Sequence, residues 1–297
     1  MLTLAPDGPH WPEALSAVRG PRLRQLWAIG NPEMLDGAPG HFVAIVGTRE
    51  ASSYGLRVAK SFARGLAAAG ATVISGMARG IDTAAHEGAL EAGGRTIAVL
   101  GTGPDVPYPA GNRWIHSQVA ERGLIISESR PGTTAFRGCF PRRNRIIAAL
   151  SHATLVVEAG HRSGALNTAA VALEMGRVVA AVPGMIDSAR AAGSNLLLRD
   201  GAHPVVSIDD ALGLVGLSRD RTPVRFEMHT IEADIWDLLG LGCQLPDVLA
   251  ERVGASLREV QASIGRLEVL GLVTHLDDGS VARAEVGQPK AVSNEAA

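Results

Sequence analysis

Short apolar runs alternate along this chain with alanine-rich stretches of helical length, and this alternation restricts the possible folds more than any other feature. Six runs are predicted strands: FVAIV (42–46), ATVIS (71–75), TIAVL (96–100), GLIIS (123–127), ATLVVE (153–158) and RVVAAV (177–182). Their apolar residues are continuous rather than alternating, which is typical of a sheet covered on both faces. Between the first two runs, apolar residues recur at helical spacing at Leu56, Ala59, Phe62, Ala63 and Leu66. The pattern predicts an α/β fold with a parallel, doubly wound sheet and helices on both faces.

The segments that flank this core have a different composition. Residues 1–40 are rich in proline and glycine and contain one short helical piece, WPEALSAV. We interpret them as an N-terminal lead-in that packs on the main domain, which we place at 41–216. Residues 217–229 are polar and are predicted to form a linker, and residues 286–297 are predicted to be a disordered tail.

Residues 230–285 are predicted to form a second, smaller domain. Three helical patterns are followed by a hairpin with Asp278-Gly279 in its turn, which together describe a winged helix. Its expected recognition helix carries a mixed set of charges and polar groups: Arg258, Glu259, Gln261, Arg266 and Glu268. A strong DNA reader is more uniformly basic, so contact with protein and weak contact with DNA remain equally open for this domain.

The cysteines and the charge narrow the class of protein further. Cys139 and Cys243 lie far apart in the sequence and form neither a disulfide framework nor a metal-binding spacing. No basic-then-apolar leader opens the chain and no run of about 18 apolar residues occurs, so we expect a cytoplasmic protein without a membrane span. The formal net charge of −2 gives no sign of nucleic-acid binding, so any such sign must come from local clusters.

Three glycine-rich turns follow the first three predicted strands: VGTREASSYG, SGMARGIDTAAHEGAL and LGTGPDVPYPAGNR. In an open parallel sheet, ligands bind outside the carboxyl ends of the strands, where helix N-termini favour phosphate. The dinucleotide signature is incomplete in GTGPDV, and no P-loop motif is present. The turns therefore indicate phosphate binding without a dinucleotide, unless the glycines only make tight turns. The candidate residues here are Gly47, Thr48, Arg49, Gly76, Arg79 and Arg113.

The stretch FRGCFPRRNRIIAALS, residues 136–151, concentrates positive charge in a region with no acidic residue between Pro131 and Val157. Its arginines are Arg137, Arg142, Arg143 and Arg145. Arginine forks bind phosphate oxygens bidentately, and Phe140, one of only five phenylalanines, lies among these arginines. The alternatives are that some of these arginines pair with carboxylates, that Asn144 and Arg145 brace the loop, and that Phe140 fills the core.

Several acidic residues near the strand ends look like acid–base or metal-binding groups in isolation. Asp82 and His86 lie four residues apart on one helical face, but we favour a helix cap or an internal hydrogen bond for Asp82, with pairing to Arg79 as the alternative. Glu128 and Glu158 each follow a strand, and we expect them to accept hydrogen bonds from the glycine loops rather than to act in catalysis.

The segment SGALNTA opens a helix at Ser163 and Gly164, and these residues are further candidates for phosphate contact. No G-x-S-x-G elbow is present, so we interpret Ser163 as a helix cap rather than as a nucleophile. The sequence therefore predicts no catalytic residue, no cofactor and no metal site.

The segments VAIVGTR, SGMARGIDTAAHEGAL, VLGTGPDVPYP, ISE, FPRRNRIIAALS, SGALNTA, AVPG and GSNLLLRDGA follow one another in the order seen in the DNA-processing protein A (DprA/Smf) family. Residues 40–212 resemble this family. The resemblance implies an extended Rossmann-like domain that forms a homodimer and, in many members, a C-terminal winged helix. It also implies a non-catalytic protein that binds incoming single-stranded DNA in natural transformation, protects it and loads the RecA recombinase onto it.

The same resemblance implies that Arg49, Arg137 and Phe140 line the DNA pocket. Two features depart from the family. Forty residues cannot hold the N-terminal helical domain of the sterile-alpha-motif type that many members carry. The lysine that some members have after the YP block is replaced by Ala110, with Arg113 as its candidate substitute.

Two other functions are compatible with a Rossmann-like body. A nucleotide phosphoribohydrolase would carry a P-G-G-x-G-T loop followed by a glutamate, and HRSGALNTA lacks both the paired glycines and the glutamate. A winged-helix transcription regulator with a ligand-sensing Rossmann body would bind duplex DNA in preference to single strands.

Overall fold

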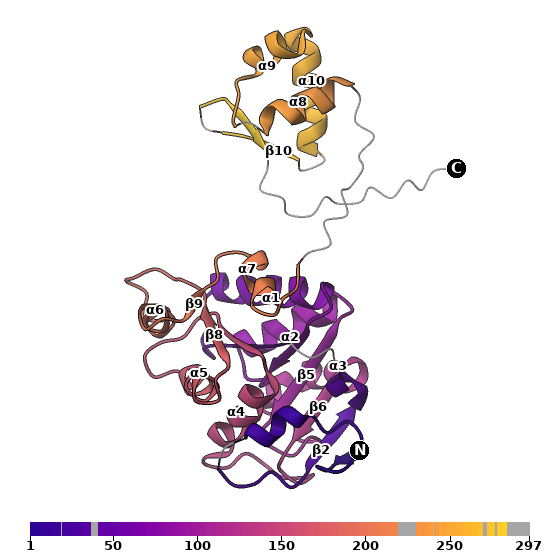
Figure 1. Ribbon diagram of the computed structural model, residues 1–297, viewed down its shortest axis with the longest axis vertical. Helices are drawn as coiled ribbons and strands as arrows, with labels where there is room; N and C mark the ends of the chain where they lie inside the picture. The colour runs from indigo at the N-terminus through magenta and orange to yellow at the C-terminus, as the bar shows by residue number, and fades with distance from the viewer. Residues whose placement is uncertain are drawn as a thin grey trace, which may run out of the picture. The chain divides into compact units, whose positions relative to one another are not determined.

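A nine-stranded sheet organises the N-terminal part of the chain (Figure 1). The computed structural model describes residues 1–18, 20–36, 41–218, 230–240, 242–269, 272–276 and 278–283. The strand order is β1-β2-β6-β5-β4-β3-β7-β8-β9. The strands are β1 Leu2–Leu4, β2 Leu26–Gly30, β3 Phe42–Val46, β4 Thr72–Ser75, β5 Arg95–Leu100, β6 Leu124–Ser127, β7 Ala153–Val156, β8 Val178–Ala181 and β9 His203–Pro204.

The centre of the sheet confirms the six predicted strands, which are β3 to β8. They pair in parallel, as does β9 with β8. Because β3, β4, β6 and β7 are buried throughout, and β5 at every residue after Arg95, the sheet needs cover on both faces, which explains the continuous apolar runs.

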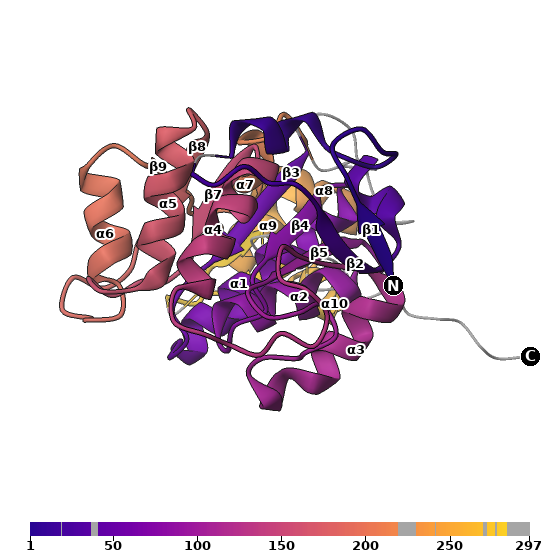
Figure 2. The ribbon, with the colours of Figure 1, turned by 90° about the horizontal axis from the view of Figure 1, so that it is seen from below.

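The N-terminal lead-in does more than pack on the domain. It contributes β1 and β2, and β2 pairs antiparallel with β6. Sequence analysis detected only its helical piece, the 3-10 helix η1 Glu13–Ala17. Figure 2 shows the N-terminus and β1 at one end of the sheet and α6 at the other.

Helices cover both faces of the sheet. One face packs against α4 Cys139–Leu150 and α5 Gly164–Glu174, together with lead-in residues such as Leu15 and Leu35. The other face packs against α1 Ser53–Ala68, α2 Ile81–Glu91 and α7 Ile208–Gly213. The remaining elements are α3 Arg113–Arg122, α6 Ala192–Arg199, η2 Pro32–Asp36 and η3 Ala110–Asn112. The predicted α/β class, with a mostly parallel sheet, is therefore confirmed.

The chain divides into two compact units, Met1–Asp220 and Arg221–Ala297. The second contains α8 Thr230–Leu239, α9 Pro246–Val253, α10 Leu257–Val269 and the antiparallel pair β10 Val273–His275 and β11 Val281–Arg283. These elements follow the predicted order around a core that includes Ile235, Leu249 and Ile264. The winged-helix assignment and the domain limits stay predictions. Residues 219–229 of the predicted linker, and the predicted tail, lie outside the described residues.

Across the part of the chain that the structure describes, none of the helices has the length and apolar character needed to cross a membrane.

Candidate functional site

The carboxyl ends of β3 to β7 place five turns along one edge of the sheet. Parallel pairing in matched register brings these turns together. They begin at Gly47, Gly76, Gly101, Glu128 and Val157. We call this the carboxyl edge. Most candidate residues from the sequence lie on it, because ligand sites of open parallel sheets form there.

The first two turns are packed against each other, and their glycines are required for this. A Cβ on Gly47 would collide with Ile81, and one on Gly80 would collide with the carbonyl oxygen of Thr48. Gly80 also has a φ of +80°, which other residues rarely adopt. Thr48 donates its N–H to the Glu158 carbonyl oxygen at 2.7 Å. The backbone around Arg49 is therefore held in a defined position.

Glu158 behaves as the sequence analysis expected. Its carboxylate accepts hydrogen bonds from the Ser52 N–H at 2.8 Å and from the Ser52 hydroxyl at 2.9 Å. Ser52 is the N-cap of α1 and its hydroxyl accepts from the Gly55 N–H. The buried Glu158 therefore holds the turn after β3 in place, and both of its carboxylate oxygens are used in these hydrogen bonds.

Arg143 lies inside the domain, with a relative exposure of 6%. Its Nη1 donates to the Gly76 carbonyl oxygen at 2.5 Å and to the Val99 carbonyl oxygen. Asp82 accepts from the N–H groups of Gly76 and Ala78 at 3.2 and 3.3 Å, which confirms the predicted internal hydrogen bonds. Burial raises the pKa of Asp82, and the Arg143 charge opposes this shift.

Glu128 differs from the expectation. It accepts from Arg142 Nε at 2.9 Å and from Arg145 Nη2 at 2.7 Å, not from the glycine loops. Arg145 also donates to the Pro21 carbonyl oxygen at 2.7 Å, so it ties α4 to the N-terminal lead-in. The neighbouring Asn144 donates to the Asn167 side chain at 3.3 Å. Asn144 and Arg145 therefore brace the structure, as one of the alternatives held.

Three of the predicted contact residues are thus placed away from the surface. Arg143, Asn144 and Arg145 are all buried, because α4 packs its apolar face against the sheet and carries these side chains inward with it. Only Arg142 of this run keeps half of its side chain exposed, beside Glu128. The sequence could not show which of the four arginines of residues 136–151 are buried, since all of them lie in one short stretch.

An arginine–aromatic cluster occupies the exposed part of the carboxyl edge. The Arg49 guanidinium lies 4.9 Å from the centroid of the Phe140 ring. The Tyr108 ring is 5.2 Å from the Phe140 ring, with an angle of 34° between them. Arg49 comes from the turn after β3, Tyr108 from the connection after β5, and Phe140 from the first turn of α4. Sequence analysis did not select Tyr108, although it belongs to the YP block of the resemblance.

Further cations lie on the connections that follow β4, β5 and β6. Arg79, Arg113 and Arg137 are exposed, and none of them forms an ion pair with another described residue. The alternative pairing of Arg79 with Asp82 does not occur among these bridges. The cluster thus presents guanidinium groups that are not neutralised by carboxylates, a property suited to a polyanion.

Two polar residues that resembled catalytic groups in the sequence, Ser163 and His86, form internal hydrogen bonds instead. The Ser163 side chain accepts from the Ala165 N–H at 3.3 Å, which confirms its role as the cap of α5. His86 is buried and pairs through Nδ1 with the Thr96 hydroxyl at 2.8 Å. Burial, assisted by the charge of Arg143, lowers the pKa of His86 to about 3. Within the described residues no group of three or more histidine, cysteine, aspartate or glutamate side chains is arranged to hold a metal ion.

Fold and site together define a class of protein: a Rossmann-like α/β protein whose strand-end turns carry free guanidinium groups and aromatic rings in place of a dinucleotide signature. Comparison with known families narrows this class. The family described as DNA recombination-mediator protein A matches residues 3–216. The chain belongs to this DprA/Smf family.

Relatives and solved structures agree with this assignment. The putative DNA processing protein DprA of Mycobacterium tuberculosis is 40% identical, over 97% of this chain and 79% of that protein. Protein Smf of Synechocystis is 43% identical, over 91% of this chain and 77% of that protein.

The X-ray structure of DprA from Streptococcus pneumoniae superposes with a TM-score of 0.67 at 38% identity, covering 71% of this chain and 73% of that one. A structure of DNA processing protein A from Helicobacter pylori, described for its single-stranded DNA binding mode, has a TM-score of 0.64 at 30% identity, covering 70% of this chain and 93% of that one.

Proposed function

We propose that this chain binds single-stranded DNA along the carboxyl edge and acts as a non-catalytic recombination mediator. The observation that carries the proposal is the Arg49–Phe140–Tyr108 cluster, in which an exposed cation and two accessible aromatic rings from distant parts of the chain meet. Single strands expose both phosphates and base faces. Cations that follow the backbone and rings that stack on bases are the two elements of sequence-independent binding to them.

Each exposed residue has a distinct role in this proposal. Arg49 contacts a phosphate while its plane stays stacked on Phe140, since a guanidinium can do both. Phe140 and Tyr108 stack on bases. Arg79, Arg113 and Arg137 extend the positive surface away from the cluster and give the bound strand a continuous cationic track.

The buried members of the site hold the exposed ones in place. Arg143 fixes Gly76 and the turn that carries Arg79, and Arg145 with Glu128 fixes the start of α4 near Phe140. Thr48 and Gly76 use their N–H groups for internal bonds, so their part is to shape the turns. A Cβ added to Gly164, at the N-terminus of α5, would meet no heavy atom within 4 Å, and Gly164 with Ser163 offers a phosphate contact at this helix N-terminus.

Membership of the DprA/Smf family supports a wider role, which we propose here. The chain protects incoming single strands during natural transformation, passes them to RecA, and works in the cytoplasm as a homodimer, which raises avidity by engaging two sites at once. The C-terminal unit is a winged helix that contacts protein or, weakly, DNA. The Helicobacter pylori relative, whose structure was described for its single-stranded DNA binding mode, supports the binding part of this role.

A direct binding measurement tests the proposal. Fluorescence anisotropy with single-stranded and duplex oligonucleotides of the same sequence, each at two salt concentrations, should give tighter binding to the single strand and weaker binding at the higher salt. Preference for duplex DNA, or release of free base from a nucleoside monophosphate, would contradict it. RecA loading is tested separately by the DNA-dependent ATPase rate of RecA, which should rise with substoichiometric amounts of this protein.

A further inference from the structure

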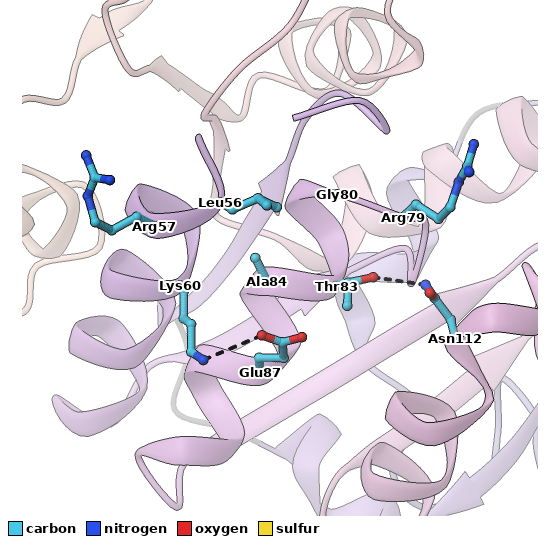
Figure 3. Close-up of a pocket in the computed structure, with 9 residues that line it drawn as sticks. All are labelled: Leu56, Arg57, Lys60, Arg79, Gly80, Thr83, Ala84, Glu87 and Asn112. Atoms are coloured by element: carbon cyan, nitrogen blue, oxygen red, sulfur yellow. Dashed lines mark hydrogen bonds and ion pairs between the residues drawn. The ribbon is translucent and has the colours of Figure 1, made fainter. Parts of the chain in front are cut away.

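A pocket of about 340 Å³ lies between α1 and α2, beside the carboxyl edge but outside the cluster described above (Figure 3). Its walls come from α1, from the turn before α2, from α2 itself and from η3. Its volume lies within the range of about 300–1,000 Å³ typical of small-molecule sites. Of the residues that line it, Arg79 alone has been given a role in the proposed function.

The two helices explain why a pocket exists here. Gly88 allows close contact at one end, since a Cβ there would collide with the carbonyl oxygen of Lys60. Lys60 also bridges the helices at that end, 2.6 Å from Glu91 and 3.6 Å from Glu87. The hydrogen bond that Lys60 donates to Glu91 raises the pKa of Lys60, so its charge is balanced locally. The unpaired positive charge of the pocket therefore belongs to Arg57 and Arg79.

The pocket adjoins the turn that carries Arg49. Gly80 forms part of its wall, and a Cβ on Gly80 would lie 3.1 Å from the carbonyl carbon of Arg49. Figure 3 shows Arg57 and Arg79 flanking the pocket from opposite sides.

The lining matches the chemistry of a nucleotide. The guanidinium of Arg57, which lines the pocket, lies 5.8 Å from the centroid of the exposed Tyr54 ring, which is outside the lining but on the same helix. This pairing resembles that of Arg49 and Phe140. Leu56 and Ala84 offer an apolar surface to a ring. Asn112 has a relative exposure of 6% and uses its amide nitrogen for Met77 and Thr83. Its carbonyl oxygen has no partner among the described residues and is available to a donor on a base or sugar.

We propose that this pocket binds one nucleotide of the single strand, next to those held at the carboxyl edge. The inference rests on the proposed function. Arg57 and Arg79 neutralise the flanking phosphates, Tyr54 and Leu56 contact the base, and Asn112 accepts a hydrogen bond. The strand thus turns off the edge of the sheet and crosses onto the surface between α1 and α2.

The test uses the full chain and a pocket variant with both Tyr54→Ala and Arg57→Ala. Both residues are exposed, so the fold should be retained. The control is Arg64→Ala, which removes an exposed arginine of the same helix outside the pocket. For a thymidylate dodecamer, the pocket variant should bind roughly tenfold more weakly, because one stacked base and one phosphate contact are lost. For a tetramer, which fills only the edge, binding should stay within about twofold.

Crosslinking distinguishes failure of this inference from failure of the proposed function. A dodecamer carrying 5-iodouracil should crosslink to peptides that contain residues 54–60 or 79–87 as well as to the edge. Unchanged dodecamer affinity in the pocket variant, with crosslinks confined to the edge, would overturn the pocket but not the proposed function. If Arg49→Glu instead binds the dodecamer with the affinity of the wild-type chain, the proposed function itself is contradicted. Binding of free thymidine monophosphate in the pocket, with dodecamer binding unaffected by the variant, would also overturn the inference.

Discussion

Arg143, in α4, donates from Nη1 to the carbonyl oxygen of Gly76, in the turn after β4, at 2.5 Å. A Cβ on Gly76 would collide with this guanidinium. An arginine from the most basic stretch of the chain is therefore a structural residue. It is buried beside Asp82 and holds the turn from which Arg79 reaches solvent.

This contact makes Gly76 sensitive to substitution. Gly76→Ala should lower the free energy of unfolding by about 1–3 kcal/mol, because overpacking forces a buried, hydrogen-bonded side chain to move. Urea unfolding at neutral pH measures this. Gly213→Ala is the matched control: no heavy atom lies within 4 Å of its added Cβ, so its stability should be unchanged or slightly higher. Equal stability of the two variants would show that Arg143 adapts without cost.

Charge reversal at Arg49 should weaken binding to single-stranded DNA for all sequences alike, since it acts on phosphates. With about four phosphates contacted, the slope of log affinity against log salt should be about −2.8 for the wild-type chain, and shallower by about 0.7 or more for Arg49→Glu. Titrations at several salt concentrations give both values. Arg64→Glu makes the same change in net charge away from the edge and should keep the wild-type slope. If Arg49→Glu binds single-stranded DNA with wild-type affinity, Arg49 is not part of the binding site.

Phe140 should contribute through stacking rather than through charge. Phe140→Leu keeps an apolar side chain but loses the aromatic face, and binding should weaken by about 1–3 kcal/mol with little change in salt slope. Phe140→Trp restores a stacking surface and should bind at least as tightly as the leucine variant. If leucine and tryptophan bind equally well, the ring serves only the packing against Tyr108.

Acid should destabilise the fold through His86. Its pKa in the folded chain is about 3, below its value of about 6.5 in an unfolded chain. The unfolded state therefore takes up a proton first, and stability is lost as the pH falls from about 6.5 towards 3. Between pH 7 and pH 5 the loss from this group should be about 2 kcal/mol.

The variant His86→Asn isolates this contribution, because its amide can keep a hydrogen bond to Thr96 without titrating in this range. Urea unfolding at pH 7 and pH 5 should show a smaller loss for the variant than for the wild-type chain. An identical loss in both would assign the acid sensitivity to other groups.

Much of the fold was predictable from local pattern. The strands β3 to β8 were predictable because fully buried strands must be apolar throughout, and that requirement is visible in a single sequence. The strands β1 and β2 were missed, since Leu2–Leu4 and Leu26–Gly30 are short, lie in a segment rich in proline and glycine, and acquire their structure only by pairing at the edge next to β6.

In the candidate site, too, the sequence predicted the position of some residues and not of others. Glycine turns at strand ends predicted that Arg49 and Arg79 would meet at one edge, because parallel topology alone brings those turns together. Arg142, Arg143 and Arg145, by contrast, carry the same charge, and the sequence does not distinguish them. Which of them faces solvent depends on how α4 lies on the sheet and on the position of Glu128, a residue from another turn.

The sequence by itself determined the parallel sheet, the location of the ligand-binding edge and the family to which the chain belongs, since each follows from short segments read in order. Only the tertiary structure decided that Arg143 and Arg145 are internal, that Tyr108 joins Phe140, and that a pocket opens between α1 and α2. The physical reason is that burial, ion pairing and cavity shape depend on groups far apart in the chain, whose distances are set only when the helices pack on the sheet.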